Sequence, residues 1–556
     1  MTKETAAATI RALEEAFNAN NFNNPENQEN SSKNVYTKYL KEFKEFEKSL
    51  TDSLQNSMGS NNPMFGEDNF RLKTTTPTQG QEIYDKGQKA QLAFGKLSVA
   101  ERVEFLNILK DEIGKRAEDI KVAIVADTGK PIDITKEELP KGDAWFKYAT
   151  DNIKQLEPVR KKITVKGKDY ENITAIKPVG VVQVIGAFNY PYALTMPGII
   201  GGLAAGNSVV ASTPDKAPNW VFPFMDAANA AVNNFVSTNT TLSGRDKEVL
   251  KEGLIQYTIG KDSKLSEKAD LVHFVGGTET GLKIKAARGS KPTILELGGS
   301  SVVTVMNSEV TSDERAKAIA QEIWGGFGPA TGQRCTAPRI VSVQEGEAME
   351  VAKKLKEICE AGPQPGAGGI GNPFSSGTKI GPLVDKKAFE RMEEVEQQAK
   401  ALGATVHGTL KVSNNLIPQK GIWVNPVVID WSTAKKDAQT TKEIHKIITQ
   451  GEIFGPLVHL IRPVKNIDEA ISVTNELDKH NLAGAIYTAN KDDVTKYING
   501  TQITSLQHNG PPKDMSPDGY HGHPGEIPIG NDHLEKYGVK VSRTVPFIDS
   551  GAERAR

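Results

Sequence analysis

Cysteine is scarce in this chain: 556 residues include only Cys335 and Cys359. Two thiols cannot form the disulfide framework of a small secreted domain, so the sequence predicts a reducing compartment, the cytoplasm. The chain also has no excess of either charge sign, since it contains 68 Lys and Arg residues and 69 Asp and Glu residues. Bulk charge therefore gives no support for binding to nucleic acid or to a membrane surface, and neither is expected as a partner.

Long uninterrupted hydrophobic runs are absent as well. The most apolar stretch, residues 190–211, is nearly long enough to span a bilayer, but it contains two prolines, four glycines and Asn207. A buried helix followed by a buried strand is the better interpretation. The first 17 residues carry acidic side chains and lack an apolar core, so no targeting segment is expected.

The length predicts two to four domains at roughly 150 residues per domain. Residues 1–76 have the character of an accessory segment, with apolar residues at helical spacing over 10–17 and 36–50. An Asn-rich stretch separates these predicted helices. A second polar linker is predicted at 56–69.

After residue 88 the pattern changes to long amphipathic helices, and Ser98 and Glu101 have the spacing of a capping box. From residue 179 onward, short apolar runs alternate with helical stretches. This alternation predicts an α/β fold with parallel sheets and helical crossovers. The predicted strands lie in the segments VGVVQVIGAF, GNSVVAS, LIQYTIG, ADLVHFVGG, PTILELGG and SVVTVM.

Gly276 and Gly277 follow one predicted strand directly and precede a predicted helix that begins at Thr278. Free backbone N–H groups at such a helix start attract phosphate, and the helix dipole adds to the attraction. The alternative is a tight strand-to-helix turn that uses glycine for steric reasons alone. The pattern does not match the G-x-G-x-x-G dinucleotide fingerprint.

Cys335 lies in the turn Gly-Gln-Arg-Cys, next to Arg334. A neighbouring guanidinium can lower the pKa of a thiol, which predicts a nucleophile. The alternative is an inert buried cysteine, and Cys359, within a predicted helix, fits that description.

Two polar residues stand at predicted strand ends. Glu296 is an acidic residue in an apolar strand, where desolvation would raise the pKa of its carboxyl and suit it to act as a general base. Asn189 could donate its amide to a developing oxyanion. For Asn189, the alternative is an asparagine that caps a turn before Pro191.

Taken together and in this chain order, the motifs FNYP, FVGGTETG, ELGG, GQRC and EIFGP resemble the aldehyde dehydrogenase superfamily. The resemblance covers roughly residues 80–500. It implies a Rossmann-like cofactor domain, an α/β catalytic domain and a small bridging β-element.

The resemblance also implies a reaction, the NAD(P)-dependent oxidation of an aldehyde to the carboxylic acid. Cys335 would attack the aldehyde to give a thiohemiacetal, with the Asn189 amide and the Cys335 backbone N–H as the oxyanion hole. After hydride transfer, Glu296 would activate the water that hydrolyses the thioester. Relatives that transfer the acyl group to coenzyme A usually lack this glutamate, so the free acid is the expected product.

Ten residues match positions that hold the cofactor in this family. Gly276 and Gly277 would lie against the pyrophosphate, Glu452 would hold the nicotinamide ribose and Phe454 would lie beside the ring. The remaining positions are Ile185, Gly186, Ala187 and Leu297 near the nicotinamide half, and Ser212 and Asp215 near the adenosine ribose.

The sequence departs from the family at the adenosine ribose. Ser212 and Thr213 replace a common lysine–proline pair, whereas Asp215 keeps the acidic position that disfavours a 2′-phosphate. Lys216 could compensate for the missing lysine. NAD is therefore the preferred cofactor, with NADP as the alternative.

By the same resemblance, residues 77–160 and 177–297 form the dinucleotide-binding domain and 298–500 the catalytic domain. Residues 161–176 and 536–550 form the bridging element, through which a homodimer or homotetramer is expected.

Residues 501–535 are predicted to be a substrate-side loop. Its histidines suggest a metal site as an alternative, but a loop over the substrate mouth is preferred and no metal is expected. They are His508, His521, His523 and His533. The extended N-terminus and the Thr-x-Pro pattern of Thr336 and Pro338 resemble those of the semialdehyde dehydrogenases of aromatic ring cleavage, so a semialdehyde is among the expected substrates.

Overall fold

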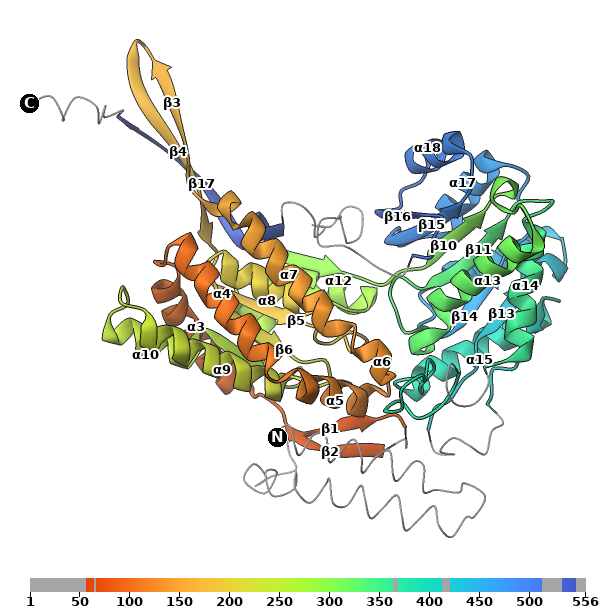
Figure 1. Cartoon of the computed structure of the whole chain (residues 1–556), viewed down its shortest axis with the longest axis horizontal. Helices are drawn as coiled ribbons and strands as arrows, with labels where there is room; N and C mark the ends of the chain where they lie inside the picture. Colours follow the sequence, from red (N-terminus) through yellow and green to blue (C-terminus); the bar gives the residue numbers. More distant parts are fainter. Residues whose placement is uncertain (1–56, 65–66, 364–368, 413–420, 513–532, 547–556) are drawn as a thin grey trace, which may run out of the picture.

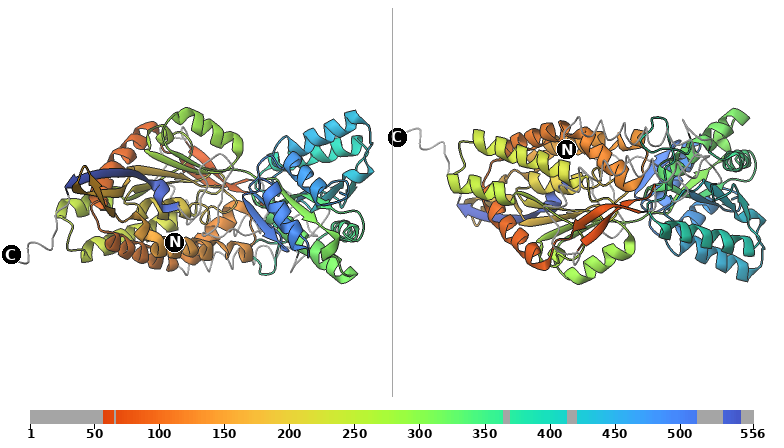
Figure 2. Two further views of the ribbon diagram at one scale, coloured as in Figure 1. Left: turned by 90° about the horizontal axis from the view of Figure 1, so that it is seen from above. Right: turned by 90° about the horizontal axis from the view of Figure 1, so that it is seen from below.

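The computed structural model describes residues 57–64, 67–363, 369–412, 421–512 and 533–546. Within these residues the strands form four sheets. Figures 1 and 2 show two lobes side by side, one built around each of the two larger sheets. The helices predicted over 10–17 and 36–50 lie outside the described residues.

The first lobe contains a five-stranded parallel sheet in the order β7-β6-β5-β8-β9. Its strands are almost wholly buried, which explains their continuous apolar sequence. The chain runs to opposite sides of the central strand β5, so a crevice opens at the carboxyl ends of the strands. The bounds are β5 (Val181–Ile185), β6 (Ser208–Ser212), β7 (Ile255–Thr258), β8 (Leu271–Val275) and β9 (Thr293–Glu296).

Helices cover both faces of this sheet (Figure 1). The predicted capping box begins α4, where Glu101 N–H donates to the Ser98 hydroxyl and the Glu101 carboxylate accepts from Ser98 N–H. The helices are α3 (Pro77–Phe94), α4 (Val99–Gly114), α5 (Ala117–Thr128), α6 (Ile132–Thr135), α7 (Glu138–Asn152), α8 (Met196–Ala204), α9 (Val221–Thr238), α10 (Gly244–Gly253), α11 (Leu265–Lys268) and α12 (Thr278–Arg288).

The second lobe contains a seven-stranded sheet in the order β12-β13-β14-β11-β10-β15-β16, in which β12 alone runs antiparallel to its neighbour. The chain enters it from the first lobe through residues 297–300. Its strands are β10 (Ser301–Val305), β11 (Pro338–Val343), β12 (Thr405–His407), β13 (Val427–Asp430), β14 (Leu457–Leu460), β15 (Ala483–Tyr487) and β16 (Ser505–His508). Its helices are α13 (Asp313–Phe327), α14 (Met349–Ala361), α15 (Lys386–Ala401), α16 (Ala438–Thr449), α17 (Ile467–Leu477) and α18 (Lys491–Gly500).

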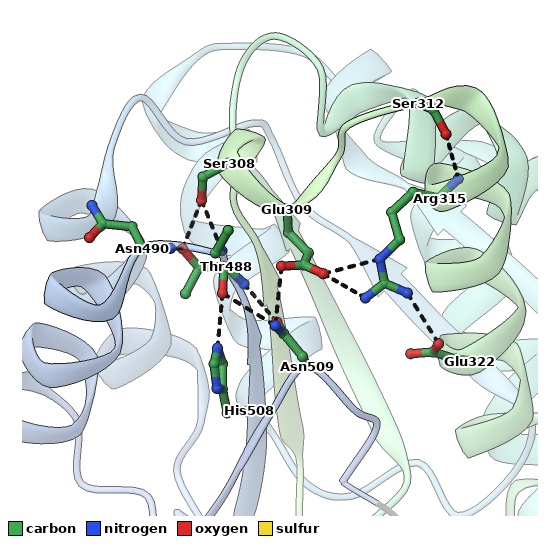
Figure 3. A network of polar contacts seen from close by, with 10 residues as sticks. Ser308, Glu309, Ser312, Arg315, Glu322, Thr488, Asn490, His508 and Asn509 are labelled. Atoms are coloured by element: carbon green, nitrogen blue, oxygen red, sulfur yellow. Dashed lines mark hydrogen bonds and ion pairs between the residues drawn. The ribbon is translucent and has the colours of Figure 1, made fainter.

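Strand β16 lies within the segment that the sequence assigned to a loop. It pairs in parallel with β15, and polar contacts fix its end (Figure 3). The Asn509 side chain accepts from Thr488 N–H at 2.9 Å and donates to Glu309 at 3.1 Å. The loop prediction is wrong for residues 505–508, because half-buried strands with mixed polarity give no apolar run.

A three-stranded antiparallel sheet projects from the first lobe as an arm (Figure 1). It consists of β3 (Val159–Val165), β4 (Lys168–Pro178) and β17 (Gly538–Pro546), in the order β17-β4-β3. Lys166 and Gly167 join β3 and β4 with positive φ angles of 50° and 75°, as a two-residue hairpin requires. Residues from both segments assigned to the bridging element, 161–176 and 536–550, thus pair in one sheet.

A second hairpin replaces the predicted polar linker at 56–69. Strand β1 (Ser57–Asn62) pairs with β2 (Glu67–Lys73), and the linker prediction is wrong there. Strands can pair through their backbones without an apolar run, so a mostly polar sequence gives no sign of the pairing. Two side chains anchor the hairpin, because Leu72 packs against Ile259 and Met64 packs in the cluster around Val125.

The apolar stretch 190–211 forms helix α8 and strand β6, as predicted. Within the described ranges, no helix is both long and apolar enough to cross a bilayer.

Candidate active site

A cavity of about 840 Å³ lies where the carboxyl end of the five-stranded sheet faces the second lobe. All thirteen residues that the sequence assigned to catalysis or cofactor binding line it, although they come from six separate stretches of chain. They are Ile185, Gly186, Ala187, Asn189, Ser212, Asp215, Gly276, Gly277, Glu296, Leu297, Cys335, Glu452 and Phe454.

Cys335 follows a strained turn. Ala330, Thr331 and Gly332 have φ angles of 55°, 56° and 64°, and the left-handed region costs a non-glycine residue roughly 1–3 kcal/mol. Neighbouring backbone fixes this turn, since Thr331 Oγ1 donates to Gly381 O at 2.8 Å and Ala330 N–H donates to Lys379 O at 2.9 Å. The strain is therefore held in place by the tertiary structure.

Arg339, on β11, binds the backbone of the turn that precedes Cys335. Its buried guanidinium donates to the carbonyl oxygens of Gly455 at 2.5 Å, Gly332 at 2.6 Å and Arg334 at 3.1 Å. Burial lowers the pKa of Arg339 to about 10, so it remains a cation at neutral pH. Two carbonyls that precede Cys335 and one from the segment after Glu452 are thus tied to one side chain.

The pKa of the Cys335 thiol moves in the opposite direction from the prediction. Burial, and then the carboxylates of Glu452 and Glu296, raise it to about 12. Arg334 was expected to lower this pKa, and that prediction is wrong because desolvation and two nearby carboxylates outweigh a neighbour in sequence. Cys335 therefore needs a base to become a thiolate. Cys359 is buried in α14, and burial raises its pKa to about 12 as well, in keeping with an inert thiol.

Glu296 ends β9 and is half-buried at the cavity wall. The two glycines after it permit close contact between the lobes. A Cβ at Gly298 would lie 2.3 Å from Glu452 Oε2, and one at Gly299 would lie 2.2 Å from the Cys335 carbonyl oxygen. Side chains at either position would push the carboxylates and the thiol apart.

Asn189 lies in the loop between β5 and α8 and is 6% exposed. The Lys130 ammonium donates to the Asn189 carbonyl at 2.9 Å and pairs with the buried carboxylate of Glu138. That carboxylate also accepts from the N–H groups of Tyr192 and Ala193, both at 3.0 Å. A closed ion pair thus fixes the loop that carries the amide.

The glycine pair that follows β8 leaves room beside the start of α12, which begins at Thr278 as predicted. A Cβ on Gly277 would meet no atom within 4 Å, while Gly276 N–H donates to Glu296 O at 3.0 Å. The helix start is therefore open toward the cavity and free to receive an anion.

Glu452 lies deep in the cavity, and burial raises the pKa of its carboxyl to about 7. Its Oε1 atom is buried with no hydrogen-bond partner among the described residues. The ring of Phe454 packs edge-on against Phe188, with centroids 5.6 Å apart. A buried oxygen without a donor fits a ligand that brings hydroxyl groups.

At the predicted adenosine end, two residues already have partners. Ser212 Oγ accepts from Gln183 Nε2 at 2.7 Å and lies 2.7 Å from Thr258 Oγ1. Asp215 forms an ion pair with Lys261 at 2.6 Å. Both residues still line the cavity, but the Ser212 hydroxyl is hydrogen-bonded to side chains of the neighbouring strands.

The four histidines of segment 501–535 do not form a described cluster. His508 is on β16 with Nε2 2.9 Å from Thr488 O, and His533 begins a 3₁₀ turn. His521 and His523 lie outside the described residues. In the described parts of the chain, no group of three His, Cys, Asp or Glu side chains could hold a metal.

Sequence analysis missed the residues that support the site, above all Lys130, Glu138 and Arg339. Lys130 and Glu138 are eight residues apart and face each other only because of the path between α5 and α7. A weak signal existed for Arg339, a charged residue at the start of an apolar strand.

Comparison with known proteins gives the family. The model of the aldehyde dehydrogenase family matches residues 50–524. The α-ketoglutaric semialdehyde dehydrogenase of Bacillus subtilis (strain 168) is 26% identical over 442 residues, which are 77% of this chain and 80% of that protein. The 2-hydroxymuconic semialdehyde dehydrogenase of Pseudomonas sp. (strain CF600) is 28% identical over 417 residues, 71% of this chain and 76% of that protein.

Solved structures agree on the fold. A betaine aldehyde dehydrogenase from Staphylococcus aureus, in complex with NAD⁺, superposes with a TM-score of 0.74 at 22% identity, covering 89% of this chain and 95% of the other. The match to the family model extends over most of the sequence. The predicted α/β fold and the predicted enzyme class, an oxidoreductase acting on aldehydes, are thereby confirmed. The chain belongs to the aldehyde dehydrogenase family.

Proposed function

We propose that this enzyme oxidises its aldehyde to the carboxylic acid with NAD as the hydride acceptor, and that Cys335, Glu296 and Asn189 carry the reaction. The observation that supports this proposal is the meeting of a thiol, a carboxylate and an amide in one cavity, from three separate chain segments. Nucleophile, base and oxyanion donor are the groups that acyl chemistry requires.

In the first step, Glu296 takes the proton of the Cys335 thiol. A base is needed because the pKa of that thiol, at about 12, keeps it protonated at neutral pH. The thiolate adds to the aldehyde carbon, and the oxyanion of the thiohemiacetal accepts hydrogen bonds from the Asn189 amide and the Cys335 backbone N–H. The Lys130–Glu138 pair holds Asn189 for this role.

In the second step, hydride leaves the carbon attached to sulfur as the oxyanion re-forms a carbonyl, which gives a thioester on Cys335. Glu296 releases the thiol proton to solvent and then takes a proton from the water that hydrolyses the thioester. The alternative, transfer of the acyl group to coenzyme A, is disfavoured because relatives with that activity usually lack the glutamate. The product is thus the free acid and a regenerated thiol.

A bound NAD would supply the hydride acceptor for this oxidation. The residues present fit such a dinucleotide, since Glu452 offers a buried oxygen without a donor and Gly277 leaves the start of α12 open. Gly276 and Gly277 would hold the pyrophosphate, Glu452 the nicotinamide ribose and Phe454 the ring edge. Ile185, Gly186, Ala187 and Leu297 would flank the nicotinamide.

At the adenosine end, Asp215 disfavours a 2′-phosphate, which supports NAD over NADP. Lys261 and Lys216 nevertheless lie in the same wall, so NADP binding is a measurable alternative. Comparing reduction of the two cofactors at equal concentration separates these possibilities.

The arm formed by β3, β4 and β17 is the proposed site of homodimer or homotetramer formation, in a reducing cytoplasm where both cysteines stay free. Its strand β3 is an edge, and Val159 on it is 65% exposed. Light scattering on the full chain, and on a Val159→Lys variant, tests this assignment. A monomeric wild type would contradict it.

The catalytic assignment is tested by following reduced nicotinamide formation at 340 nm with NAD and a panel of aldehydes. Cys335→Ala should abolish turnover while the protein still binds NAD. Glu296→Gln should slow steady turnover by about 100- to 10,000-fold, because an activated water is lost. Steady oxidation by Cys335→Ala at the wild-type rate would remove the nucleophile assignment.

A further inference from the structure

Gln183 is a buried polar residue on the central strand β5, and the reaction described above does not use it. It lines the cavity, although it is only 4% exposed. Its Nε2 donates to Ser212 Oγ at 2.7 Å, whereas its Oε1 is buried and has no hydrogen-bond partner in the part of the chain that the structure describes. A buried amide oxygen without a donor costs free energy, so a cavity ligand that supplies a donor is favoured at this position.

The nitrogen end of the Gln183 amide is held by two hydroxyl groups in a row. Ser212 Oγ lies 2.7 Å from Thr258 Oγ1, and Thr258 is buried on β7. In the strand register Ile185 pairs with Ser212, and Ser212 pairs with Thr258. Gln183 is two residues before Ile185 and therefore shares its face of the sheet. Because these hydroxyls engage Nε2, the amide oxygen is left for the cavity.

The cavity wall beside Gln183 is apolar. Ile185, Phe274 and Ile284 line it and pack in one hydrophobic cluster. A flat ring system packs well on such a wall, and a sugar attached to the ring carries hydroxyl groups. A hydroxyl matches the buried amide in chemistry, since it donates a hydrogen bond without bringing a charge that would have to be desolvated.

We propose that the Gln183 amide oxygen accepts a hydrogen bond from a hydroxyl of the adenosine ribose of NAD. This inference rests on the proposed function, because it assigns a contact to the cofactor named there. Ser212, which replaces the lysine common in the family, then acts indirectly. Its hydroxyl positions the amide of Gln183, and Gln183 recognises the ribose.

The test is a double-mutant cycle between Gln183 and the ribose, read as binding rather than turnover. Calorimetry on the Cys335→Ala protein gives Kd for NAD and for its forms that are 2′-deoxy or 3′-deoxy at the adenosine ribose. At least one deoxy form should bind about 5- to 50-fold more weakly than NAD, the range expected for a hydroxyl that satisfies a buried acceptor. Adding Gln183→Met, which keeps the length of the side chain but removes the amide oxygen, should bring that ratio to within about twofold of one.

Thr258→Val is the matched control, because Thr258 belongs to the same row of hydroxyls but lies one strand further from Gln183. It should leave the ratio of deoxy form to NAD unchanged, since the amide oxygen is still present. A ratio that is lost in Thr258→Val as well would show that the row and not the amide sets the preference, and would overturn the assignment.

Three further results would also overturn it. They are equal Kd values for NAD and both deoxy forms in the Cys335→Ala protein, a ratio that survives in Gln183→Met, and a Gln183-dependent loss of affinity seen only when hypoxanthine replaces adenine. The last result would place the amino group of the base, rather than the ribose, at the amide. Circular dichroism verifies folding of each variant, and Gln183→Leu serves if Gln183→Met does not fold.

Failure of this inference differs from failure of the proposed function. If the Cys335→Ala protein binds NAD with the Gln183-dependent preference while the wild type reduces NAD with no aldehyde, the proposed function fails and the ribose contact stands. If aldehydes are oxidised with NAD while the deoxy forms bind as tightly as NAD, the contact fails and the proposed function stands. If NAD does not bind, both fail.

Discussion

Two loops meet at the reacting centre, and each is held by one buried cation in a different way. Arg339 holds the nucleophile loop by donating to three backbone carbonyls. Lys130 holds the oxyanion loop by donating to one carbonyl while paired with Glu138, which in turn accepts from two N–H groups. In the first arrangement the cation donates only to backbone carbonyls and has no carboxylate within ion-pair distance among the described residues, whereas the second is a closed, neutral unit.

The difference matters for catalysis because the two loops have different tasks. The nucleophile loop has to become negative when the thiolate forms, and a buried cation behind it favours that change. The oxyanion loop only has to present an amide, so a neutral pair can fix it without altering the local charge. Variants of the Lys130–Glu138 pair should therefore mainly lower stability, whereas variants of Arg339 should also lower activity.

The largest effect is expected from breaking the closed pair. Lys130→Met leaves the Glu138 carboxylate buried and uncompensated, which should lower the free energy of unfolding by about 3–5 kcal/mol. Urea denaturation measures this loss. Lys130→Met combined with Glu138→Gln should recover most of it, since Gln still offers an oxygen to Tyr192 and Ala193.

An exposed pair provides the reference for this measurement. Lys147 and Asp151 are 2.6 Å apart but 75% and 55% exposed, so Lys147→Met should cost less than about 1 kcal/mol. Equal losses for Lys130→Met and Lys147→Met would show that the closed pair does not stabilise the oxyanion loop.

A smaller loss of stability, with a clear loss of activity, is expected from Arg339→Met. Three carbonyls lose their donor, and we expect about 2–3 kcal/mol of destabilisation because buried acceptors are left unpaired. The activity should fall mainly in kcat, as the strained turn before Cys335 relaxes. Urea denaturation measures the loss of stability, and steady-state kinetics measures the loss of kcat. A variant that changes KM alone would contradict the positioning role.

The smallest effect concerns the charge facing the thiol. Above pH 7 the Glu452 carboxyl, with a pKa of about 7, is ionised and opposes thiolate formation on Cys335. Glu452→Gln should therefore speed alkylation of Cys335 by iodoacetamide about 3- to 10-fold at pH 8.5 and hardly at all at pH 6. Peptide mass spectrometry follows the reaction, with buried Cys359 as the internal control. If the variant-to-wild-type ratio of alkylation rates were the same at both pH values, the charge on Glu452 would not be what opposes thiolate formation.

Sequence reasoning predicted the strands of the five-stranded sheet and the residues that end them. Their apolar runs are continuous because both faces are buried, and buried strands give the strongest pattern. It failed at β1, β2 and β16, where mostly polar residues pair through the backbone and half-exposed faces leave no apolar run. It also placed His508 in a loop, because nothing local reveals the Asn509 contacts that end β16.

The sequence by itself determined which chemical groups are available and in what order: an amide and a carboxylate at strand ends, then a thiol in a turn, and glycines where close approach is needed. The tertiary structure decided how those groups behave. Burial and two carboxylates that are distant in sequence reversed the expected shift of the Cys335 pKa. Folding also brought Lys130 to Asn189 and left Arg334 buried beside the cavity. Electrostatic energies depend on distance and desolvation in three dimensions, and neither can be read from adjacency along the chain.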